Sequence, residues 1–381
     1  MNNTIKLAVA SALLAAASSA SAAGGIVAGD WTLDIGGNVN AYVTSTKTDG
    51  AQAVNNITTG LLPNFLSVSG KTRQNDLDVN FTISVQPGAA ESGTLADSAE
   101  GGTLSSRQAF VTFGDASWGS IKLGKDLGIY ASDAILSDMT LLGVGAGAAS
   151  VGNTTLGRIG YGYQYADWKS QAAYSSPNFN GFQFTAGITQ AWNATGSTTA
   201  VTLRGGGEPA FEGKASYSFA GDVSGKVWVS GISQNIQLTS TTDTTASAWD
   251  IGANVNVAGF GLTGYYGEGK GTGTLGQFAS GLDTSGNKRD NEDWYVQATY
   301  TLPGVATKLG ASYGESTNKG TTASASADNE ATKDMWTFGA YHPLTKHLNL
   351  VVEYSEAGVQ ATRTAATVDS KTISAGAILF F

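Results

Sequence analysis

The segment Lys371-Thr372-Ile373-Ser374-Ala375-Gly376-Ala377-Ile378-Leu379-Phe380-Phe381 alternates between two kinds of side chain. One stripe is apolar and consists of Ile373, Ala375, Ala377, Leu379 and Phe381. A two-residue period of this kind indicates a β-strand with one apolar and one polar face. Because the sequence ends on this strand, we expect another strand to cover its edge, and closing the sheet into a barrel would do so. In a membrane, closure is required, since lipid cannot satisfy an unpaired N–H or C=O group.

The same alternation recurs along the whole chain. In residues 77–85, for example, Leu77, Val79 and Phe81 alternate with Asp78 and Asn80. The pattern predicts strands around residues 31–44, 66–68, 77–85, 109–113, 121–123, 168–174, 182–188, 215–219, 227–229, 249–257, 262–266, 294–300, 309–313, 336–340, 348–354 and 371–381. Many of these stripes carry Trp, Tyr or Phe near one end, as expected for aromatic girdles at two membrane interfaces.

The connections between these strands alternate in length. Short turns such as Gly221-Asp222 and Pro303-Gly304 alternate with long polar loops, of which residues 126–167 form the longest. Treating residues 159–165 as part of that loop keeps the alternation regular and gives sixteen strands. The sequence therefore predicts an all-β fold, a 16-stranded antiparallel transmembrane β-barrel with short periplasmic turns and long extracellular loops. A barrel of this size leaves a water-filled lumen.

The first 22 residues have the features of a secretory signal peptide. Lys6 precedes an apolar run at residues 7–17, and Ala20-Ser21-Ala22 matches a small-residue cleavage site. The apolar run is too short for a spanning helix. We therefore predict a signal peptide at residues 1–22 and one barrel domain at residues 23–381. Since strands begin at Trp31, no room is expected for an N-terminal plug domain.

Composition restricts the chemistry of the protein. Charged residues make up 13% of the chain, Cys is absent, and the formal net charge is -9. A low charge content suits a surface that partly faces lipid, and a negative net charge argues against nucleic acid as a partner. The two histidines, His342 and His347, flank a predicted periplasmic turn, which argues against an enzyme with a base-activated nucleophile. No motif for a nucleotide or another cofactor is present.

Several stretches resemble those of a known family. Residues 106–114 (SRQAFVTFG) and 118–125 (WGSIKLGK) resemble the fourth and fifth strands of the general Gram-negative trimeric porins. Residues 174–182 (YSSPNFNGF) resemble the turn after strand six, and residues 341–347 (YHPLTKH) resemble a late turn. The resemblance implies a homotrimer in the cell outer membrane, with the third loop folded into the lumen as a constriction. It also implies that Phe381 is recognised by the barrel assembly machinery.

Strand parity identifies charges that face the lumen. The inward basic residues are Lys71, Arg73, Lys122, Lys169, Lys214, Lys226 and Lys308, and the inward acids are Asp34, Asp76, Asp78, Asp250 and Glu353. The resemblance implies that acids on the third loop face a basic cluster on the wall, producing a transverse field. By that comparison, the pore constriction would contain Lys122 and Lys169 on the wall and Asp133 and Asp138 on the loop, with Arg158 on either side.

Two departures from the family pattern leave ion preference open. The basic cluster consists mostly of Lys rather than Arg, and a Gly/Ala-rich stretch at residues 141–149 replaces the acidic segment of the family loop. The expected function is passive diffusion of ions and small hydrophilic solutes. The alternative is a substrate-specific channel for a sugar or organic anion, in which Phe110, Trp228 and Tyr265 would form a stacking track.

Overall fold

The computed structural model describes residues 25–88, 104–147, 150–151, 154–192, 207–238, 241–278, 280–283, 285–321 and 330–381. The predicted signal peptide lies outside these residues, and its boundary stays a prediction. No helix within the described part of the chain combines the length and the apolar character needed to cross a bilayer.

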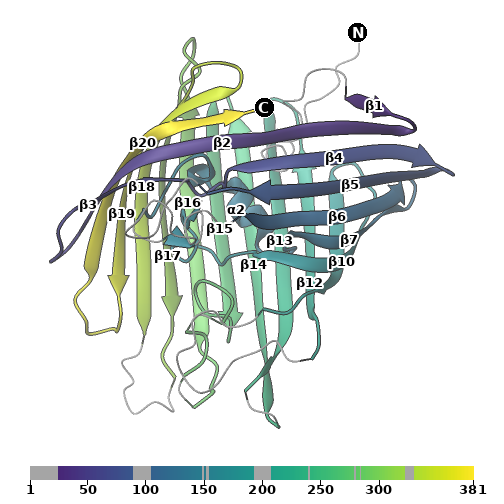
Figure 1. Ribbon diagram of the computed structural model, residues 1–381. Helices are drawn as coiled ribbons and strands as arrows, with labels where there is room; N and C mark the ends of the chain where they lie inside the picture. The colour runs from purple at the N-terminus through teal and green to yellow at the C-terminus, as the bar shows by residue number, and fades with distance from the viewer. Residues whose placement is uncertain are drawn as a thin grey trace.

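Sixteen antiparallel strands form one closed barrel (Figure 1). They are β2 (Trp31–Thr48), β4 (Phe65–Gln74), β5 (Leu77–Gln86), β6 (Ser105–Asp115), β7 (Gly119–Leu127), β10 (Trp168–Ser175), β11 (Phe182–Thr189), β12 (Ala210–Phe219), β13 (Val223–Gln237), β14 (Asp243–Val257), β15 (Phe260–Lys270), β16 (Asp290–Thr301), β17 (Lys308–Asn318), β18 (Ala331–Pro343), β19 (Leu348–Gln360) and β20 (Val368–Phe380). Each strand pairs with the next, and β20 pairs with β2. The predicted strand number and closure are confirmed.

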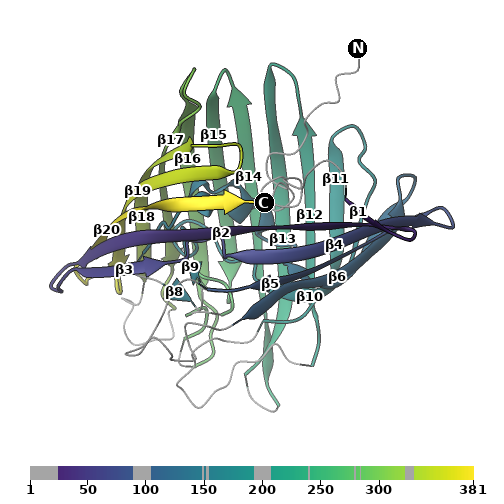
Figure 2. The same ribbon diagram turned by 45° about the horizontal axis from the view of Figure 1, so that its top comes forward.

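The closing seam extends to the last residue. The backbone of Phe381 donates to Gly37 O (3.1 Å) and accepts from Gly37 N (2.9 Å), so both polar groups of the final residue join the ladder. Figure 2 shows β20 lying along β2 at this seam. Two short strands, β1 (Ile26–Ala28) and β3 (Val54–Thr58), also pair with β2.

The two faces of the wall are inverted relative to a soluble protein. On β2, Val39 and Val43 are 58% and 60% exposed, whereas the inward Asn38 and Asn40 are buried. Large exposed apolar side chains occur in the same way on most other strands. This pattern suits a barrel whose outer wall contacts acyl chains and whose inner wall contacts water or an inserted loop.

The constriction loop, residues 128–167 between β7 and β10, lies inside the barrel. It contains helix α2 (Ser132–Ser137), a 3₁₀ helix at Met139–Leu142 (η1), and the hairpin of β8 (Ser150–Val151) and β9 (Thr154–Thr155). Figure 1 shows α2 within the ring of strands. Apolar loop residues, including Ile135, Leu141 and Val144, pack against inward side chains of the far wall. Those wall side chains are Tyr42, Trp228, Tyr265, Tyr295, Tyr341, Val351 and Ile378.

This packing explains the Gly/Ala-rich stretch. A close approach of loop to wall occurs at Gly143, where an added Cβ would lie 2.1 Å from the Glu353 carboxylate. A larger residue there would displace either the loop or the Glu353 carboxylate that binds it. The predicted insertion of the third loop into the lumen is therefore confirmed. The loop is rich in small and apolar residues because it packs closely against the wall.

Candidate conduction site

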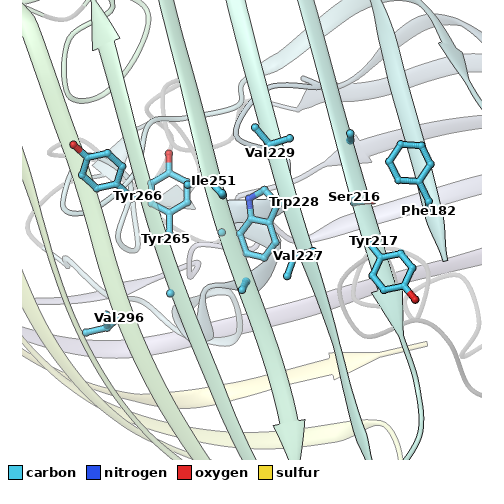
Figure 3. Close-up of a pocket in the computed structure, with 14 residues that line it drawn as sticks. Phe182, Ser216, Tyr217, Val227, Trp228, Val229, Ile251, Tyr265, Tyr266 and Val296 are labelled. Carbon is cyan, nitrogen blue, oxygen red and sulfur yellow. The ribbon is translucent and has the colours of Figure 1, made fainter.

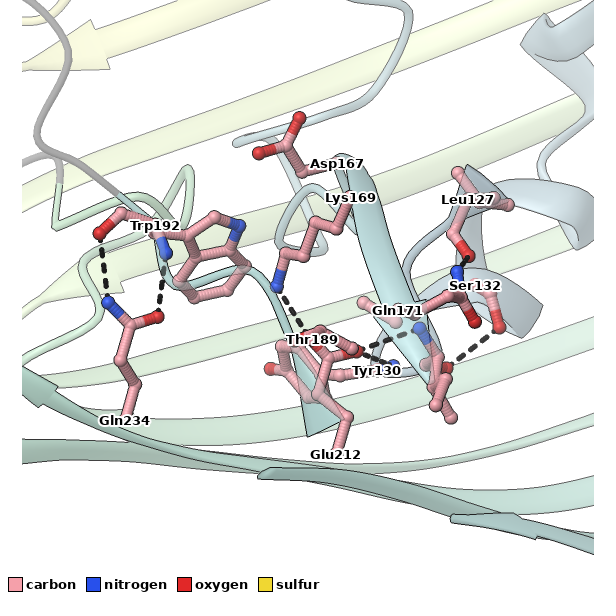
Figure 4. A network of polar contacts seen from close by, with 12 residues as sticks. Leu127, Tyr130, Ser132, Asp167, Lys169, Gln171, Thr189, Trp192, Glu212 and Gln234 are labelled. Atoms are coloured by element: carbon pink, nitrogen blue, oxygen red, sulfur yellow. Dashed lines mark hydrogen bonds and ion pairs between the residues drawn. The ribbon is translucent and has the colours of Figure 1, made fainter. Parts of the chain in front are cut away.

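A buried glutamate on β12 fixes the start of the constriction loop. One carboxylate oxygen of Glu212 accepts from the backbone N–H groups of Ile129 (2.7 Å) and Tyr130 (2.8 Å). The other accepts from Lys169 Nζ (2.5 Å) and Thr189 Oγ1 (2.8 Å). Figure 4 shows this network between β10, β11, β12 and the loop. A carboxylate with four donors is fully satisfied, so the loop is bound at this point.

Two further wall side chains hold the middle of the loop. Glu353 on β19 accepts from Val144 N (2.7 Å), Gly145 N (2.9 Å) and the hydroxyl of Tyr341 (2.7 Å). Gln297 on β16 accepts from Met139 N (2.7 Å) and donates to the carbonyl of Ser137 (3.0 Å). The loop backbone is therefore attached to the barrel on β12, β16 and β19, and the aperture beside it has a fixed position.

Arg158, in the second half of the constriction loop, is fully buried. Its guanidinium donates to the carbonyl of Met335 (2.8 Å) and to Ser312 Oγ (2.5 Å). Burial lowers the pKa of Arg158, and the charge of Asp138 opposes that shift. A side chain with no exposed surface cannot contact a passing solute, so the contacts of Arg158 attach the end of the loop to β17 and β18.

Asp138 is also buried and acts within the loop. Its carboxylate caps η1 by accepting from Thr140 N (2.9 Å) and Thr140 Oγ1 (2.6 Å), and it accepts from the hydroxyl of Tyr163 (2.8 Å). These contacts shape the turn between α2 and η1. They do not bring Asp138 to any of the predicted wall lysines.

Asp133 is the loop acid that meets a basic cluster on the wall. Its carboxylate forms ion pairs with Lys214 of β12 (3.2 Å) and Lys226 of β13. The two lysine side chains are each 25% exposed, whereas Asp133 is 3% exposed. Two ammonium groups therefore share one carboxylate beside the aperture, so these three side chains together carry a net positive charge, and the buried Asp250 also interacts electrostatically with Lys214. Both lysines were among the inward basic residues identified by parity, but not among the predicted constriction residues.

The two predicted wall candidates have other partners. Lys122 on β7 pairs with Asp126 on the same strand, and its ammonium lies 4.7 Å from the centre of the Phe110 ring. Lys169 is buried against Glu212, with its ammonium 3.9 Å from the centre of the Trp192 ring. The structure thus does not bring Lys122 or Lys169 to Asp133 or Asp138. Lys122 is 30% exposed and lies on the lumen side, whereas Lys169 is enclosed.

Lys71 and Arg73 lie at the turn end of β4, where inward side chains are exposed. Arg73 forms ion pairs with Asp78 (2.9 Å) and Asp115 (2.9 Å), and none of the ion pairs of the described residues includes Lys71. Other polar inward side chains with exposed or partly exposed surface on this wall are Asn80, Thr82, Thr112 and Lys122. Because the loop packs on the opposite wall, these side chains identify the side of the lumen on which the conduction path is expected.

Two of the three residues of the predicted stacking track are enclosed, and only Phe110 keeps exposed surface. Trp228 and Tyr265 are 3% and 5% exposed and belong to the cluster beneath the constriction loop. A groove of about 620 Å³ lies on the same strands, but its apolar lining includes Tyr217, Val229 and Ile251, which face outward (Figure 3). This groove is part of the lipid-facing wall and does not contribute to the lumen.

The charge state of the Asp133 group leads to a pH prediction. Burial alone would raise the pKa of Asp133, but Lys214 and Lys226 outweigh burial and hold it below the ordinary value of 3.8. Stability from this ion pairing is present above the unfolded-state pKa and is lost as pH falls through the lowered folded-state value. We expect the contribution of Asp133 to ion selectivity, measured as the difference between the wild type and Asp133→Asn, to stay constant down to the ordinary aspartate range and to disappear only below it.

Reversal potentials measured across a pH series would check this expectation. Asp133→Asn should show the low-pH selectivity of the wild type already at neutral pH, because it removes the same charge. A titration step above pH 3.8 that Asp133→Asn abolishes would contradict the lowered pKa.

These features together define a class of protein. A closed barrel with an apolar outer wall, a polar inner wall and a constriction loop attached inside is a water-filled channel of the outer membrane. A family model described as Gram-negative porin matches residues 8–362, and the chain belongs to this family. It is accordingly an outer-membrane protein.

Solved structures agree with this assignment at the level of the fold. The outer membrane channel DcaP of Acinetobacter baumannii has 19% identity and a TM-score of 0.69, with 94% of this chain and 100% of that chain covered. OmpF of Salmonella typhi, solved with daunomycin, has 16% identity and a TM-score of 0.59, with coverage of 91% and 98%. In-vitro folded OmpT of Vibrio cholerae has 15% identity and a TM-score of 0.58, with coverage of 93% and 99%. The comparison with curated proteins gives no match.

Proposed function

We propose that the protein is a homotrimeric diffusion channel for ions and small hydrophilic solutes, with a preference for anions. The observation that carries this proposal is the asymmetric lumen, in which a loop bound to one wall leaves exposed polar side chains on the other. The channel needs no catalytic group or cofactor, because selectivity comes from the width of the lumen and the charges along it. We further propose that residues 1–22 are removed on export and that Phe381 is recognised by the barrel assembly machinery.

The anion preference rests on which charges remain accessible. Glu212, Glu353 and Asp138 are buried in contacts with the loop or wall. Lys214, Lys226 and Lys122 keep exposed surface near the loop, opposed by Asp126 and the buried Asp133. The accessible charge at this level is therefore net positive. The same lysines favour an organic anion over a sugar if the channel proves to be substrate-specific.

Conductance in planar bilayers tests the proposal. We expect ohmic single-channel currents in KCl, with a reversal potential in a salt gradient on the anion-selective side. Organic anions and neutral sugars of similar size should be compared, because saturable block by one solute would indicate a specific channel. A folded protein that passes no current through lipid would contradict the proposed function.

Trimerisation has a separate prediction. OmpT of Vibrio cholerae was solved in a form described as a trimer, which supports the same assembly here. We expect a band at three times the mass of the mature chain on mild detergent gels, converting to monomer on heating. A folded, heat-modifiable monomer at all detergent concentrations would exclude a stable homotrimer.

A further inference from the structure

Five buried oxygen atoms between the constriction loop and strands β14 to β16 lack a hydrogen-bond partner in good geometry. They are Asp250 Oδ2, Asp293 Oδ1, Gln164 Oε1 and the hydroxyl oxygens of Tyr130 and Tyr265. Asp250, Asp293, Gln164 and Tyr130 have no exposed surface, and Tyr265 is 5% exposed. Buried polar atoms normally have partners, so each of these atoms requires an explanation.

The arrangement on the wall brings these groups together. Gly267 on β15 lies directly between Asp250 on β14 and Asp293 on β16. The Tyr265 hydroxyl occupies the space above Gly267, since an added Cβ there would lie 2.7 Å from it. Tyr130, from the start of the loop, interacts electrostatically with both carboxylates and contacts the Tyr265 hydroxyl. Gln164, from the end of the loop, donates to Asp293 Oδ2 (3.3 Å).

The charges of this region do not balance. Glu212 has Lys169, Asp133 has Lys214 and Lys226, and Asp138 is opposed by Arg158. Glu353 is stabilised by two backbone N–H groups and one hydroxyl. Asp250 and Asp293 remain, because none of the ion pairs of the described residues includes either of them. Lys214 acts on Asp250 only beyond ion-pair distance. Two buried carboxylates without an ion-pair partner are costly, and buried charges are normally paired or bound to a metal.

We propose that these oxygens bind a Ca²⁺ ion, which joins both ends of the constriction loop to the wall. These five atoms are all oxygens, and hard divalent cations prefer oxygen ligands. Ca²⁺ accepts many ligands in irregular geometry, whereas Mg²⁺ requires near-octahedral geometry and usually keeps several waters. No group of three or more His, Cys, Asp and Glu residues suited to a metal occurs in the described residues. The two carboxylates would therefore share the ion with hydroxyl oxygens, the amide oxygen and water.

The consequence concerns the aperture. Tyr130 and Gln164 lie near the two ends of the loop, whereas Asp250, Tyr265 and Asp293 belong to adjacent wall strands. An ion among them would add a cross-link to the attachments made by Glu212, Gln297 and Glu353. Removing Ca²⁺ would then loosen the loop without affecting the strand ladder. The binding site itself does not depend on the proposed anion preference or on conduction.

Terbium luminescence tests the site on the folded full-length mature protein in detergent. Tb³⁺ replaces Ca²⁺ and emits when a nearby tyrosine is excited, and both Tyr130 and Tyr265 are in position to sensitise it. We expect a Tyr-sensitised signal in chelator-treated protein that Ca²⁺ displaces and that Mg²⁺ and Na⁺ at equal concentration do not. Asp250→Asn combined with Asp293→Asn should abolish this signal.

A matched control removes two carboxylates from the outer face. Glu268 and Glu292 are directly opposite each other on β15 and β16 near the extracellular loops, and Tyr266 donates to Glu268 (2.6 Å). Glu268→Gln combined with Glu292→Gln should keep the Ca²⁺-displaceable signal. No displaceable signal in the wild type, an unchanged signal in the inner variant, or its loss only in the outer variant would overturn the proposal.

A second variant covers the case in which the inner double substitution fails to fold. Tyr130→Phe combined with Tyr265→Phe keeps the shape of both side chains and removes two of the five oxygen atoms. We expect this variant to fold, as judged by heat-modifiability on gels, and to bind Ca²⁺ more weakly than the wild type. Equilibrium dialysis measures this affinity, because it does not depend on sensitisation by the two tyrosines. Unchanged Ca²⁺ and Tb³⁺ affinity in the folded variant would overturn the proposed ligand set.

Discussion

Replacing both Glu212 and Glu353 with Ala should release the constriction loop and raise the single-channel conductance severalfold. The double substitution leaves four backbone N–H groups of the loop without their acceptors, together with the Tyr341 hydroxyl and the ammonium of Lys169. Each unsatisfied buried donor costs about 1–3 kcal/mol, and breaking a buried ion pair costs about 3–5 kcal/mol. The barrel keeps its strand ladder, so the loop is the part that loses its place.

Trypsin provides an independent measurement of loop release. Arg158 is the only Lys or Arg in residues 128–167, and it is fully buried in the wild type. We expect the folded wild-type barrel to resist cleavage after Arg158 and the double variant to be cut there. Glu268→Ala combined with Glu356→Ala is the control, because both carboxylates lie on the outer face and neither contacts the loop. Equal conductance and equal resistance at Arg158 in the Glu212/Glu353 variant would show that these residues do not hold the loop.

The barrel could be predicted from the sequence because the membrane imposes a local rule on every strand. Side chains such as Val39 and Val43 face lipid, while Asn38 and Asn40 between them face inward, so each strand carries its own two-residue signal. The alternation of short and long connections then gives the number of strands. No contact between distant residues is needed for either inference.

The constriction site depends on contacts between distant residues, and parity alone could not assign them. Parity placed Lys169 and Lys214 on the inner face. It could not predict that Lys169 is buried beneath Trp192 or that Lys214 pairs with Asp133. Glu212 was missed altogether, although it shares the inward parity of Lys214 on β12. The signal that could have found it is an acid two residues from an inward lysine on a strand.

Lys214 and Lys226 are expected to dominate ion selectivity. Replacing both with Gln removes two positive charges beside the aperture and leaves Asp133 without its partners. A unit charge at contact distance changes the energy of a passing ion by about 1 kcal/mol in water, and each 1.4 kcal/mol is about tenfold in a ratio. Because two charges act in opposite directions on cations and anions, we expect the cation-to-anion permeability ratio to rise by at least about an order of magnitude, with the reversal potential moving to the cation-selective side.

The matched variants separate accessible charge from buried charge. Lys122→Gln should shift the reversal potential less, because it removes one positive charge instead of two. That charge is paired with Asp126 and lies on another strand, β7. Lys169→Gln should leave selectivity unchanged and destabilise the loop start, since its ammonium is enclosed between Glu212 and Trp192 and does not meet the passing ion. A larger selectivity shift from Lys169→Gln than from the Lys214/Lys226 variant would mean that the conduction path runs along β10. The loop would then have to leave the position that its wall contacts define.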